Sequence, residues 1–304
     1  MRESEFIQWI CQQGGLDPAL VEVGPGDDCA VLKLGGERLL VTTDQLLDGV
    51  HGSLETHGPE ALGRKAAARA VSDIAAMAGL PVAMVATVAA PRGFSRPQAE
   101  ALYRGLRAAA DELSCPLVGG DLAAWAAGPG PLAITVTVLG RCGELAPVLR
   151  SGARAGDVVC VTGALGGAWR SGRDLTFRPR LAEARLLAER FGLHALIDIS
   201  DGLAADLGHL AAASGVGAEL DASAVPVHAD AAGLADPLAA ALSDGEDYEL
   251  LFALPEGQAE RLLASQPLGV PVTRIGRIVA GAGLTLIRDG RRQALPPSGW
   301  EHET

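Results

Sequence analysis

Six short acidic segments of this chain place aspartate beside glycine, serine or threonine, and most lie just before or after an apolar run. They are Gly26-Asp27-Asp28, Thr42-Thr43-Asp44, Ser72-Asp73, Gly119-Gly120-Asp121, Asp198-Ile199-Ser200-Asp201-Gly202 and Asp244-Gly245-Glu246-Asp247. Turns at strand ends are where ligands gather in α/β folds. Carboxylates from several strand ends suit Mg²⁺, which binds hard oxygen ligands and often shares them with phosphates. The six segments together predict a metal–phosphate site.

Each acidic segment also has a plainer interpretation as a turn, a cap or an ion pair. In an extended segment Asp27 and Asp28 point to opposite sides, so at most one of them faces a shared site directly. Asp73 follows Arg69 by four residues on an expected helix, so an intrahelical ion pair competes with metal binding. Asp201 is equally suited to cap a helix. The prediction therefore depends on the whole set, which fits one purpose near strand ends.

Other sources of catalytic chemistry are weaker in this sequence. It contains neither GxxxxGK[ST] nor Gly-x-Ser-x-Gly. Lys33 and Lys65 are the only lysines and lie in no recognisable catalytic motif, which argues against a lysine nucleophile. Residues 163–167, Gly-Ala-Leu-Gly-Gly, could hold a phosphate on backbone N–H groups, although a plain turn is the stronger interpretation. His51 could meet a phosphate or a ring, and Glu246 could accept hydrogen bonds from a substrate amine.

The composition indicates a folded protein that does not bind nucleic acid. The 304 residues favour two domains, and the 48% hydrophobic and 20% charged residues are typical of a globular chain. The net charge of −12 argues against non-specific binding to nucleic acid. It does not exclude anionic substrates, because bound Mg²⁺ inverts the local field.

Cysteine usage and hydropathy predict a reduced, cytoplasmic protein. The five cysteines, at 11, 29, 115, 142 and 160, are odd in number and show no CxxC spacing, which argues against a disulfide framework or a zinc site. The N-terminus lacks a signal-peptide pattern. Two uncharged stretches, 74–91 and 122–140, are interrupted by Gly-Leu-Pro and Gly-Pro-Gly-Pro, so we predict no membrane span.

Hydrophobic periodicity predicts helices and strands in both halves of the chain. The expected helices are 5–13, 59–77, 95–113, 181–191, 202–213, 228–241 and 255–264. The expected strands are 29–32, 39–43, 82–89, 116–118, 132–139, 157–162, 195–199, 218–220, 248–253, 272–278 and 284–287. A glycine- and arginine-rich segment, 140–156, separates the two groups. We therefore predict two α/β or α+β domains, residues 1–142 and 143–304.

Seven motifs follow one another in an order known from one enzyme family. They are Gly-Asp-Asp-Cys-Ala (26–30), Thr-Thr-Asp (42–44) with His51, Val-Ser-Asp-Ile-Ala-Ala-Met-Ala-Gly (71–79), Val-Gly-Gly-Asp (118–121), Arg-Ser-Gly-Ala-Arg-Ala-Gly-Asp (150–157), Asp-Ile-Ser-Asp-Gly-Leu (198–203) and Asp-Gly-Glu-Asp-Tyr-Glu-Leu (244–250). From about residue 5 to Trp300 the chain resembles the thiamine-monophosphate kinase family, part of the aminoimidazole-ribonucleotide-synthetase-like superfamily of ATP-using enzymes.

The resemblance implies a fold and a reaction. The expected reaction is ATP + thiamine monophosphate → ADP + thiamine diphosphate, with several Mg²⁺ ions. The expected assembly is a homodimer in which N-terminal domain strands form a shared barrel, each chain adding a C-terminal α/β domain. The active site would lie near the interdomain cleft and the dimer face.

The resemblance also implies roles for individual residues, carried over motif by motif. The implied metal ligands are Asp28, Thr42, Thr43, Asp44, Asp73, Asp121, Asp198 and Asp201. The implied ATP contacts are Tyr103, Gly120, Asp121, Arg150 and Ser200, and the implied thiamine-side contacts are His51, Glu246 and Trp300. Within these sets, Asp44, Asp73, Asp121 and Arg150 are expected to be catalytic.

One departure from the family pattern and several rival functions stay open at this point. The loop from Gly163 to Arg180 is short, and the usual Pro-x-Pro-Arg appears as Phe177-Arg178-Pro179-Arg180, so the sequence does not predict how this lid-like region covers the substrate. The rivals are selenophosphate synthetase, the purine-pathway cyclo-ligase and a non-catalytic maturation factor of the same fold. Against the first, Cys11 has no lysine near it.

Overall fold

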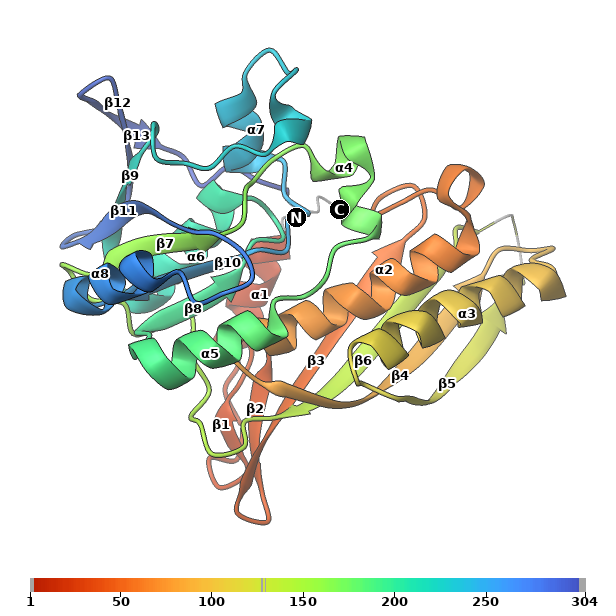
Figure 1. Cartoon of the computed structure of the whole chain (residues 1–304). Coiled ribbons are helices and arrows are strands. Elements are labelled where there is room, and N and C mark those ends of the chain that lie inside the picture. Colours follow the sequence, from red (N-terminus) through yellow and green to blue (C-terminus); the bar gives the residue numbers. More distant parts are fainter. Residues whose placement is uncertain (1–2, 127, 129, 301–304) are drawn as a thin grey trace.

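Two mixed β-sheets lie on either side of one long helix, α2 (Leu54–Ala76), in the computed structural model of the chain (Figure 1). The structure describes residues 3–126, 128 and 130–300. Among these residues, no helix combines the length and apolar character needed to cross a membrane.

The regular elements alternate along the whole chain. The other helices are α1 (Glu3–Gln12), α3 (Arg96–Glu112), α4 (Ala168–Ser171), α5 (Leu181–Phe191), α6 (Leu203–Ser214), α7 (Pro237–Ser243) and α8 (Glu256–Ser265), with 3₁₀ turns η1 (Arg173–Leu175) and η2 (Ala229–Ala231). The strands are β1 (Val21–Val23), β2 (Ala30–Leu34), β3 (Glu37–Leu47), β4 (Leu80–Ala90), β5 (Leu117–Ala124), β6 (Ala133–Arg141), β7 (Val158–Thr162), β8 (Ala195–Asp198), β9 (Gly217–Asp221), β10 (Leu250–Leu254), β11 (Val272–Val279), β12 (Gly283–Arg288) and β13 (Arg291–Leu295).

Helices cover one face of the first sheet, and its other face is exposed. Its order is β1-β2-β3-β6-β4-β5, antiparallel throughout except for the β4–β5 pair. Along β3, Leu40, Thr42 and Leu46 are buried on the side of α2, whereas Thr43 and Gln45 are exposed on the opposite side. The sheet therefore has an inner face that contributes to the core and an outer face open to solvent in this single chain.

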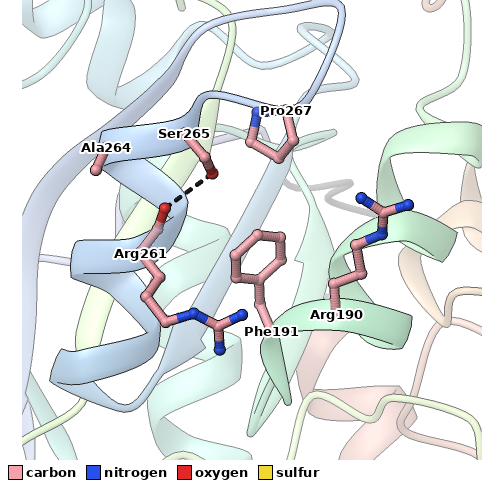
Figure 2. Close-up of a pocket in the computed structure, with 6 residues that line it drawn as sticks. All are labelled: Arg190, Phe191, Arg261, Ala264, Ser265 and Pro267. Atoms are coloured by element: carbon pink, nitrogen blue, oxygen red, sulfur yellow. Dashed lines mark hydrogen bonds between the residues drawn. The ribbon is translucent and has the colours of Figure 1, made fainter.

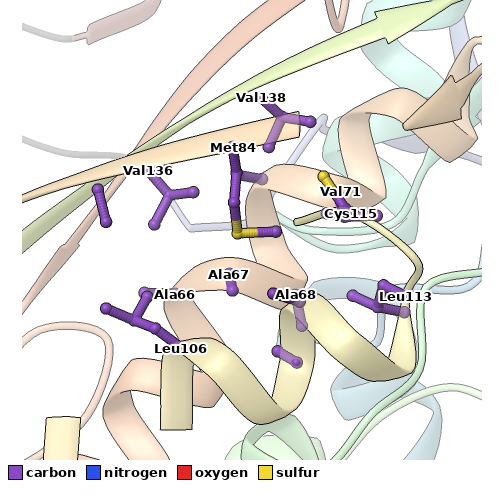
Figure 3. Packing of buried hydrophobic residues seen from close by; sticks show 14 of the residues in the cluster. Ala66, Ala67, Ala68, Val71, Met84, Leu106, Leu113, Cys115, Val136 and Val138 are labelled. Carbon is purple, nitrogen blue, oxygen red and sulfur yellow. The ribbon is translucent and has the colours of Figure 1, made fainter. Parts of the chain in front are cut away.

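Small residues let α2 and α3 pack closely on the inner face of the first sheet (Figure 3). Ala66 of α2, Leu106 of α3 and Met84 of β4 belong to one buried cluster. A Cβ atom on Gly105 of α3 would overlap the carbonyl oxygen of Glu60 on α2, so this crossing requires glycine. The close contact fixes α2 against the sheet, and with it every side chain that α2 presents to the site.

Strands β7, β10 and β8 of the second sheet are buried on both faces. Its order is β13-β12-β9-β11-β7-β10-β8. Neighbouring residues alternate between two cores: Cys160 and Phe252 pack with α5 and α8, whereas Val161 and Leu251 pack with α6 and α7. The second half is thus a three-layer α/β unit, and each half of the chain has its own core, as the predicted two-domain α/β class requires.

Most predicted elements are confirmed, including the capping box at the start of α3, formed by Ser95 and Gln98. The helix predicted over 228–241 is wrong, because the segment contains η2, a break and then α7. Pro237 opens α7, and Asp236 before it has non-helical backbone angles, φ −135° and ψ 89°, because a following proline disfavours the helical conformation. Sequence analysis also missed β1, α4 and β13.

The boundary predicted after residue 142 falls in the connection from β6 to β7, between the two sheets. We keep the division into residues 1–142 and 143–304 as a proposal. The shared barrel in a dimer likewise stays a prediction.

Candidate active site

One face of α2 presents four polar side chains to the site. Lys65, Arg69, Ser72 and Asp73 are spaced at i, i+4, i+7 and i+8, so they lie in one stripe along the helix. With a rise of about 1.5 Å per residue, Lys65 and Asp73 are separated by about 12 Å along the axis. Arg69 and Asp73 bond β3, whereas Lys65 and Ser72 bond segments of the second half of the chain. Helix α2 therefore holds two charged clusters at a fixed spacing.

The first, the acidic cluster, consists of Asp28, Asp73 and Asp198. One carboxylate oxygen of each lies within 4.8 Å of the others. Thr42 Oγ1 donates to Asp73 Oδ2 at 2.5 Å, and the Ser72 hydroxyl donates to Asp198 Oδ2. Four of the acidic segments, which are far apart in the sequence, thus converge where α2 meets β3 and β8.

Arg150 supplies positive charge beside the acidic cluster. Its Nη2 and Nε donate to the two oxygens of Asp28 at 2.6 and 3.1 Å, a bidentate pair. Its backbone N–H donates to Asp27 Oδ2 at 3.2 Å. Asp28 is therefore the member of the Asp-Asp pair that lies in the cluster, while Asp27 anchors the segment after β6.

Burial and mutual repulsion raise the pKa values of these carboxyl groups. Burial, and next the charge of Asp28, raises the pKa of Asp198 to about 7. The same two causes raise the pKa of Asp27 to about 6. The pKa of Asp73 is raised well above its ordinary value, first by burial and then by the charges of Asp198 and Asp44. Burial and repulsion between the carboxylates thus both disfavour the ionised form of the acidic cluster.

Asp44 lies on the same inner face as Thr42 but is paired with Arg69. Arg69 Nη2 donates to Asp44 Oδ1 at 3.2 Å, and Nε lies 2.9 Å from Oδ2 in a direction too oblique for a hydrogen bond. Arg69 thus pairs with Asp44 rather than with Asp73, which resolves the alternative that the sequence left open. In the described part of the chain, Arg69 Nη1 is buried without a hydrogen-bond partner.

The second, the lysine cluster, consists of Lys65, Asp174, Glu246 and the carbonyl group of His51. The Lys65 side chain is fully buried. Its Nζ lies 2.6 Å from Asp174 Oδ2, 2.7 Å from the His51 oxygen and 2.8 Å from Glu246 Oε2. The contacts to Asp174 and His51 are hydrogen bonds, and the contact to Glu246 is an ion pair. The lysine cluster therefore joins two of the predicted substrate contacts, His51 and Glu246, through one side chain.

Sequence analysis did not identify Lys65, Asp174 or Tyr248, whose hydroxyl also bonds the lysine cluster. Lysine is rarely buried completely, so the sequence gives no reason to expect that a lone lysine in an alanine-rich helix is buried in a site. The signal that could have found it is its spacing: Lys65 precedes Arg69 by four residues and Asp73 by eight. Those intervals place all three on one stripe of the helix.

Two predicted contacts, Thr43 and Tyr103, point away from both clusters in this chain. Thr43 Oγ1 lies 3.0 Å from Thr137 Oγ1 on the outer face of the first sheet. Tyr103 is on the exposed surface of α3, with 53% of its surface accessible. The structure does not bring either side chain to Asp44 or Asp73.

Gly120 and Asp121 lie on β5, the edge strand of the first sheet. The register runs from Asp44 on β3 through β6 and β4 to Gly120, which is three strand spacings, or about 14 Å. Asp121 is exposed and pairs in register with Thr87, which is exposed on the outer face. Asp121 is therefore accessible from the face that α2 does not cover.

Ser200, Asp201 and Trp300 surround the turn that carries Glu246. The Glu246 N–H donates to the Ser200 carbonyl at 2.8 Å, and the Trp300 N–H donates to the Asp201 carbonyl at 2.9 Å. The carboxylate of Asp206, rather than that of Asp201, accepts backbone N–H groups at the start of α6. The capping interpretation of Asp201 is therefore wrong, and the predicted residues Glu246, Ser200 and Trp300 are held together by backbone bonds.

The lid-like segment from Gly163 to Arg180 is fixed against its surroundings. The Gly166 N–H donates to both oxygens of Asp247, at 3.0 and 2.9 Å, so the plain-turn interpretation of the glycine loop holds for this N–H group. Arg180 Nε donates to Glu249 Oε2 at 2.8 Å. The segment therefore packs between α2 and the second sheet and brings Asp174 to the lysine cluster.

A surface hollow between α5 and α8 lies apart from this chemistry (Figure 2). Arg190, Phe191, Arg261 and Pro267 are among the residues that line it, and the Arg261 guanidinium lies 5.7 Å from the centre of the Phe191 ring. The predicted site residues do not line this hollow, so the two clusters on α2 remain the candidate site.

Comparisons with known proteins identify relatives over nearly the whole chain. The family model described as AIR synthase related protein, N-terminal domain, matches residues 26–142, and that of the C-terminal domain matches residues 168–289. The thiamine-monophosphate kinase of Rhodopirellula baltica is 38% identical over 296 residues, covering 93% of this chain and 92% of the relative.

Solved structures show the same architecture. A structure of AaThiL complexed with AMPPCP and TMP superposes with a TM-score of 0.84 at 30% identity, covering 99% of this chain and 97% of the other. HypE of E. coli, a hydrogenase maturation protein, superposes with a TM-score of 0.73 at 22% identity, covering 98% of each chain, which shows the fold alone.

Proposed function

Because this chain belongs to the AIR synthase related proteins and, within them, to the thiamine-monophosphate kinases, we propose that it transfers the γ-phosphate of ATP to thiamine monophosphate. The products are ADP and thiamine diphosphate. The observation that carries the proposal is the placement of the acidic cluster and the lysine cluster on one stripe of α2, about 12 Å apart. The acidic cluster suits phosphates and cations, and the lysine cluster suits the organic part of the substrate.

The acceptor supplies its own nucleophile. A phosphate monoester has a second pKa of about 6 and is largely dianionic at neutral pH. One of its oxygens bonds to the γ-phosphorus as the bond from that phosphorus to the bridging oxygen of ADP breaks, and no proton has to be removed. A catalytic base is therefore unnecessary, which agrees with a buried lysine that is already paired with Asp174 and Glu246. The work of the site is positioning and charge neutralisation.

We propose that Mg²⁺ binds at the acidic cluster, because its carboxylates and the Thr42 hydroxyl form a set of hard oxygen donors with unmatched charge. Asp28, Asp73 and Asp198 would hold it, and bound Mg²⁺ would neutralise the facing phosphates. The other proposed metal ligands are Thr43, Asp44, Asp121 and Asp201.

Arg150 orients the phosphate end of the site. Its bidentate pair with Asp28 uses Nε and Nη2, which leaves Nη1 as the edge for a phosphate oxygen. We propose that Arg150 and Ser200 contact the phosphates of ATP. At the other end, His51, Glu246 and Trp300 contact the thiamine part of the acceptor.

We also propose that a homodimer completes the nucleotide end, with Tyr103, Gly120 and Asp121 acting from the partner subunit. This is supported by the separation of about 14 Å between β3 and β5 and by the exposure of apolar side chains on the first sheet. Val85, Val118 and Leu122 have 37%, 65% and 60% of their surface exposed. A cytoplasmic location stays a prediction, supported by five unpaired cysteines.

Mixing two inactive variants tests the shared site. If Asp121 serves the partner, equal amounts of Asp73→Ala and Asp121→Ala protein form mixed dimers that each contain one intact site. Random reassortment should then restore about a quarter of the wild-type activity. A mixture as inactive as its two parents, in dimers shown to exchange subunits, would mean that Asp73 and Asp121 act in the same chain.

An ADP-release assay on the purified protein tests the proposed function. Thiamine monophosphate should support turnover, whereas thiamine, an aminoimidazole-ribonucleotide precursor and selenide should not. Mass spectrometry should find thiamine diphosphate in amounts equal to the ADP. Turnover with one of the other acceptors, and not with thiamine monophosphate, would replace the proposal by the corresponding rival.

A further inference from the structure

We propose that Lys65 is a positioning residue for the acceptor: it fixes the Glu246 carboxylate so that the second oxygen of Glu246 accepts a hydrogen bond from an amino group of the substrate heterocycle. The inference rests on the proposed function, because it assigns Glu246 to the thiamine end of the site.

The contacts of Lys65 leave it no other chemistry. Its side chain has no exposed surface; it donates hydrogen bonds to Asp174 and the His51 carbonyl, and its Nζ forms an ion pair with Glu246 Oε2 at 2.8 Å. His51 follows β3 in the first half of the chain, whereas Glu246 precedes β10 in the second. One ammonium group therefore sets the distance between two substrate contacts that belong to different halves of the chain.

Glu246 is held by one oxygen only. Its Oε2 forms an ion pair with Lys65 Nζ at 2.8 Å and accepts a hydrogen bond from the Tyr248 hydroxyl at 2.9 Å. Within the described residues, its Oε1 has no hydrogen bond, and 15% of the side chain is exposed. These two partners hold Oε2 and leave Oε1 available to a ligand. An acceptor held in this way suits a neutral amino group on a flat ring, such as an aminopyrimidine.

The backbone of Glu246 shows that this orientation is imposed by its surroundings. Glu246 has a φ of 61°, in the left-handed region that side chains rarely adopt, and Tyr248 has a φ of 51°. The Glu246 N–H is held by the Ser200 carbonyl, and the Tyr248 ring stacks on Phe177 with centroids 3.8 Å apart. Strain of this kind persists where neighbours determine the conformation, which is frequent at ligand sites.

The neighbouring residue on α2 separates positioning from simple structural support. Arg64 donates to the carbonyl groups of Leu175 and Phe177, so it ties the same lid-like segment to α2 as Lys65 does through Asp174. The contacts that distinguish Lys65 from Arg64 are those to Glu246 and to the His51 carbonyl. Arg64→Met is therefore a matched control, since it removes a cation and a tie to the segment without touching Glu246.

Trp169 offers a readout that does not depend on turnover. Its ring centre lies 5.0 Å from Lys65 Nζ, and 43% of its surface is exposed. Thiamine monophosphate bound at Glu246 would change the surroundings of this indole. Titration with thiamine monophosphate should change the tryptophan fluorescence of the wild-type protein. The part of this change that is lost in Trp169→Phe comes from Trp169, and its concentration dependence gives the dissociation constant of the acceptor.

The experiment compares Lys65→Met, Arg64→Met, Glu246→Gln and the double variant Lys65→Met/Glu246→Gln. Lys65→Met should raise KM and Kd for thiamine monophosphate by about tenfold or more, the effect of one charge-assisted hydrogen bond. It should leave KM for ATP unchanged, and Arg64→Met should leave both KM values near those of wild type. The double variant should bind the acceptor no more weakly than Glu246→Gln alone, because Lys65 acts through Glu246.

Three outcomes would overturn the proposal: an unchanged KM for the acceptor in Lys65→Met, an equal effect of Arg64→Met, or losses that multiply in the double variant. If Lys65→Met folds poorly because it leaves Asp174 buried and unpaired, Lys65→Met/Asp174→Asn removes that charge and repeats the test. A wild-type protein that makes no thiamine diphosphate would instead contradict the proposed function, which keeps the two failures distinct.

Discussion

The acidic cluster and the lysine cluster lie on the same stripe of α2, and both bury charge, yet only the lysine cluster is completed by the protein. Lys65 places a full positive charge between Asp174 and Glu246 and also donates to the His51 carbonyl. Three carboxylates of the acidic cluster lie within 4.8 Å of one another, and Arg150 pairs with only one of them. Among the described residues, the oxygens of Asp73 and Asp198 receive hydroxyl groups and no cation.

The difference shows how the site divides its tasks. A buried ion pair that keeps all its hydrogen bonds contributes little to stability but fixes geometry, which is what the organic end of a substrate requires. Repelling carboxylates destabilise the folded chain unless a cation arrives, which is what a phosphate-transfer end requires. The same helix thus combines a cluster built for position with a cluster built to receive charge.

The largest expected effect comes from removing a carboxylate of the acidic cluster. Asp73→Ala should lower kcat by roughly 10²- to 10³-fold or more, the scale of one essential electrostatic contact in a transition state. Its metal-free stability should equal or exceed that of wild type, because one of three repelling charges is gone. Steady-state kinetics at saturating Mg²⁺ and urea denaturation check both parts. Asp111→Ala, on the exposed surface of α3, is the control.

Asp44→Ala should also abolish turnover, but at a cost in stability that Asp73→Ala does not have. It leaves the Arg69 guanidinium in its partly buried position without its carboxylate. Removing one partner of such a pair costs about 3 kcal/mol. The double variant Asp44→Ala/Arg69→Met should therefore recover stability without recovering turnover. Equal stability of the single and double variants would show that Arg69 does not depend on Asp44.

A smaller effect should follow from adding Mg²⁺ to the protein without nucleotide. Binding to the folded state alone adds about 2.7 kcal/mol at a concentration 100 times the Kd. Wild-type protein should show this rise in thermal stability, and Asp73→Ala should lose most of it. Lys65→Arg changes the lysine cluster and leaves the acidic cluster intact. Its thermal stability should therefore respond to Mg²⁺ as that of wild type does. An equal response of Asp73→Ala and wild type would place the metal elsewhere.

Much of the acidic cluster was predictable from sequence, because strand ends and helix starts are local patterns. Asp28 and Asp198 lie at strand ends, Asp73 lies instead in the last turn of α2, and the fold brings the three together. The partner of Arg69 was not predictable, since a pair four residues apart on a helix competes with a strand residue that only the tertiary structure brings near. Lys65 was missed for the same reason: its three partners come from positions 51, 174 and 246.

The outer face of the first sheet marks a different limit of sequence reasoning. The sequence motif assigns Thr43 and Asp121 to the same metal set as Asp44. Strand alternation turns Thr43 to the outer face, and the strand order places β5 at the edge. A motif lists the residues that a site needs without saying whether one chain or two supply them, so their common role depends on the dimer proposed above.

The smallest expected effect distinguishes the clusters by pH. The pKa of Asp198 is about 7 in the folded chain, raised first by burial, against an ordinary value of 3.8. The folded state therefore holds this proton more tightly than the unfolded state does. The stability that protonated Asp198 contributes to the folded state is fully present below about pH 3.8 and is lost as the pH rises through 7.

Between pH 6 and pH 8 without metal, wild-type protein should lose more stability than Asp198→Asn, which keeps an acceptor for the Ser72 hydroxyl but has no charge to bury. The difference should be on the order of 1 to 2 kcal/mol, since each unit of pKa shift corresponds to about 1.4 kcal/mol. Thermal unfolding in a chelating buffer at both pH values measures it. Saturating Mg²⁺ should shrink the difference, because a bound cation favours the ionised carboxylate. Parallel pH profiles of the two proteins would instead mean that neighbouring groups already compensate the charge of Asp198, and the contrast with the lysine cluster would then fail.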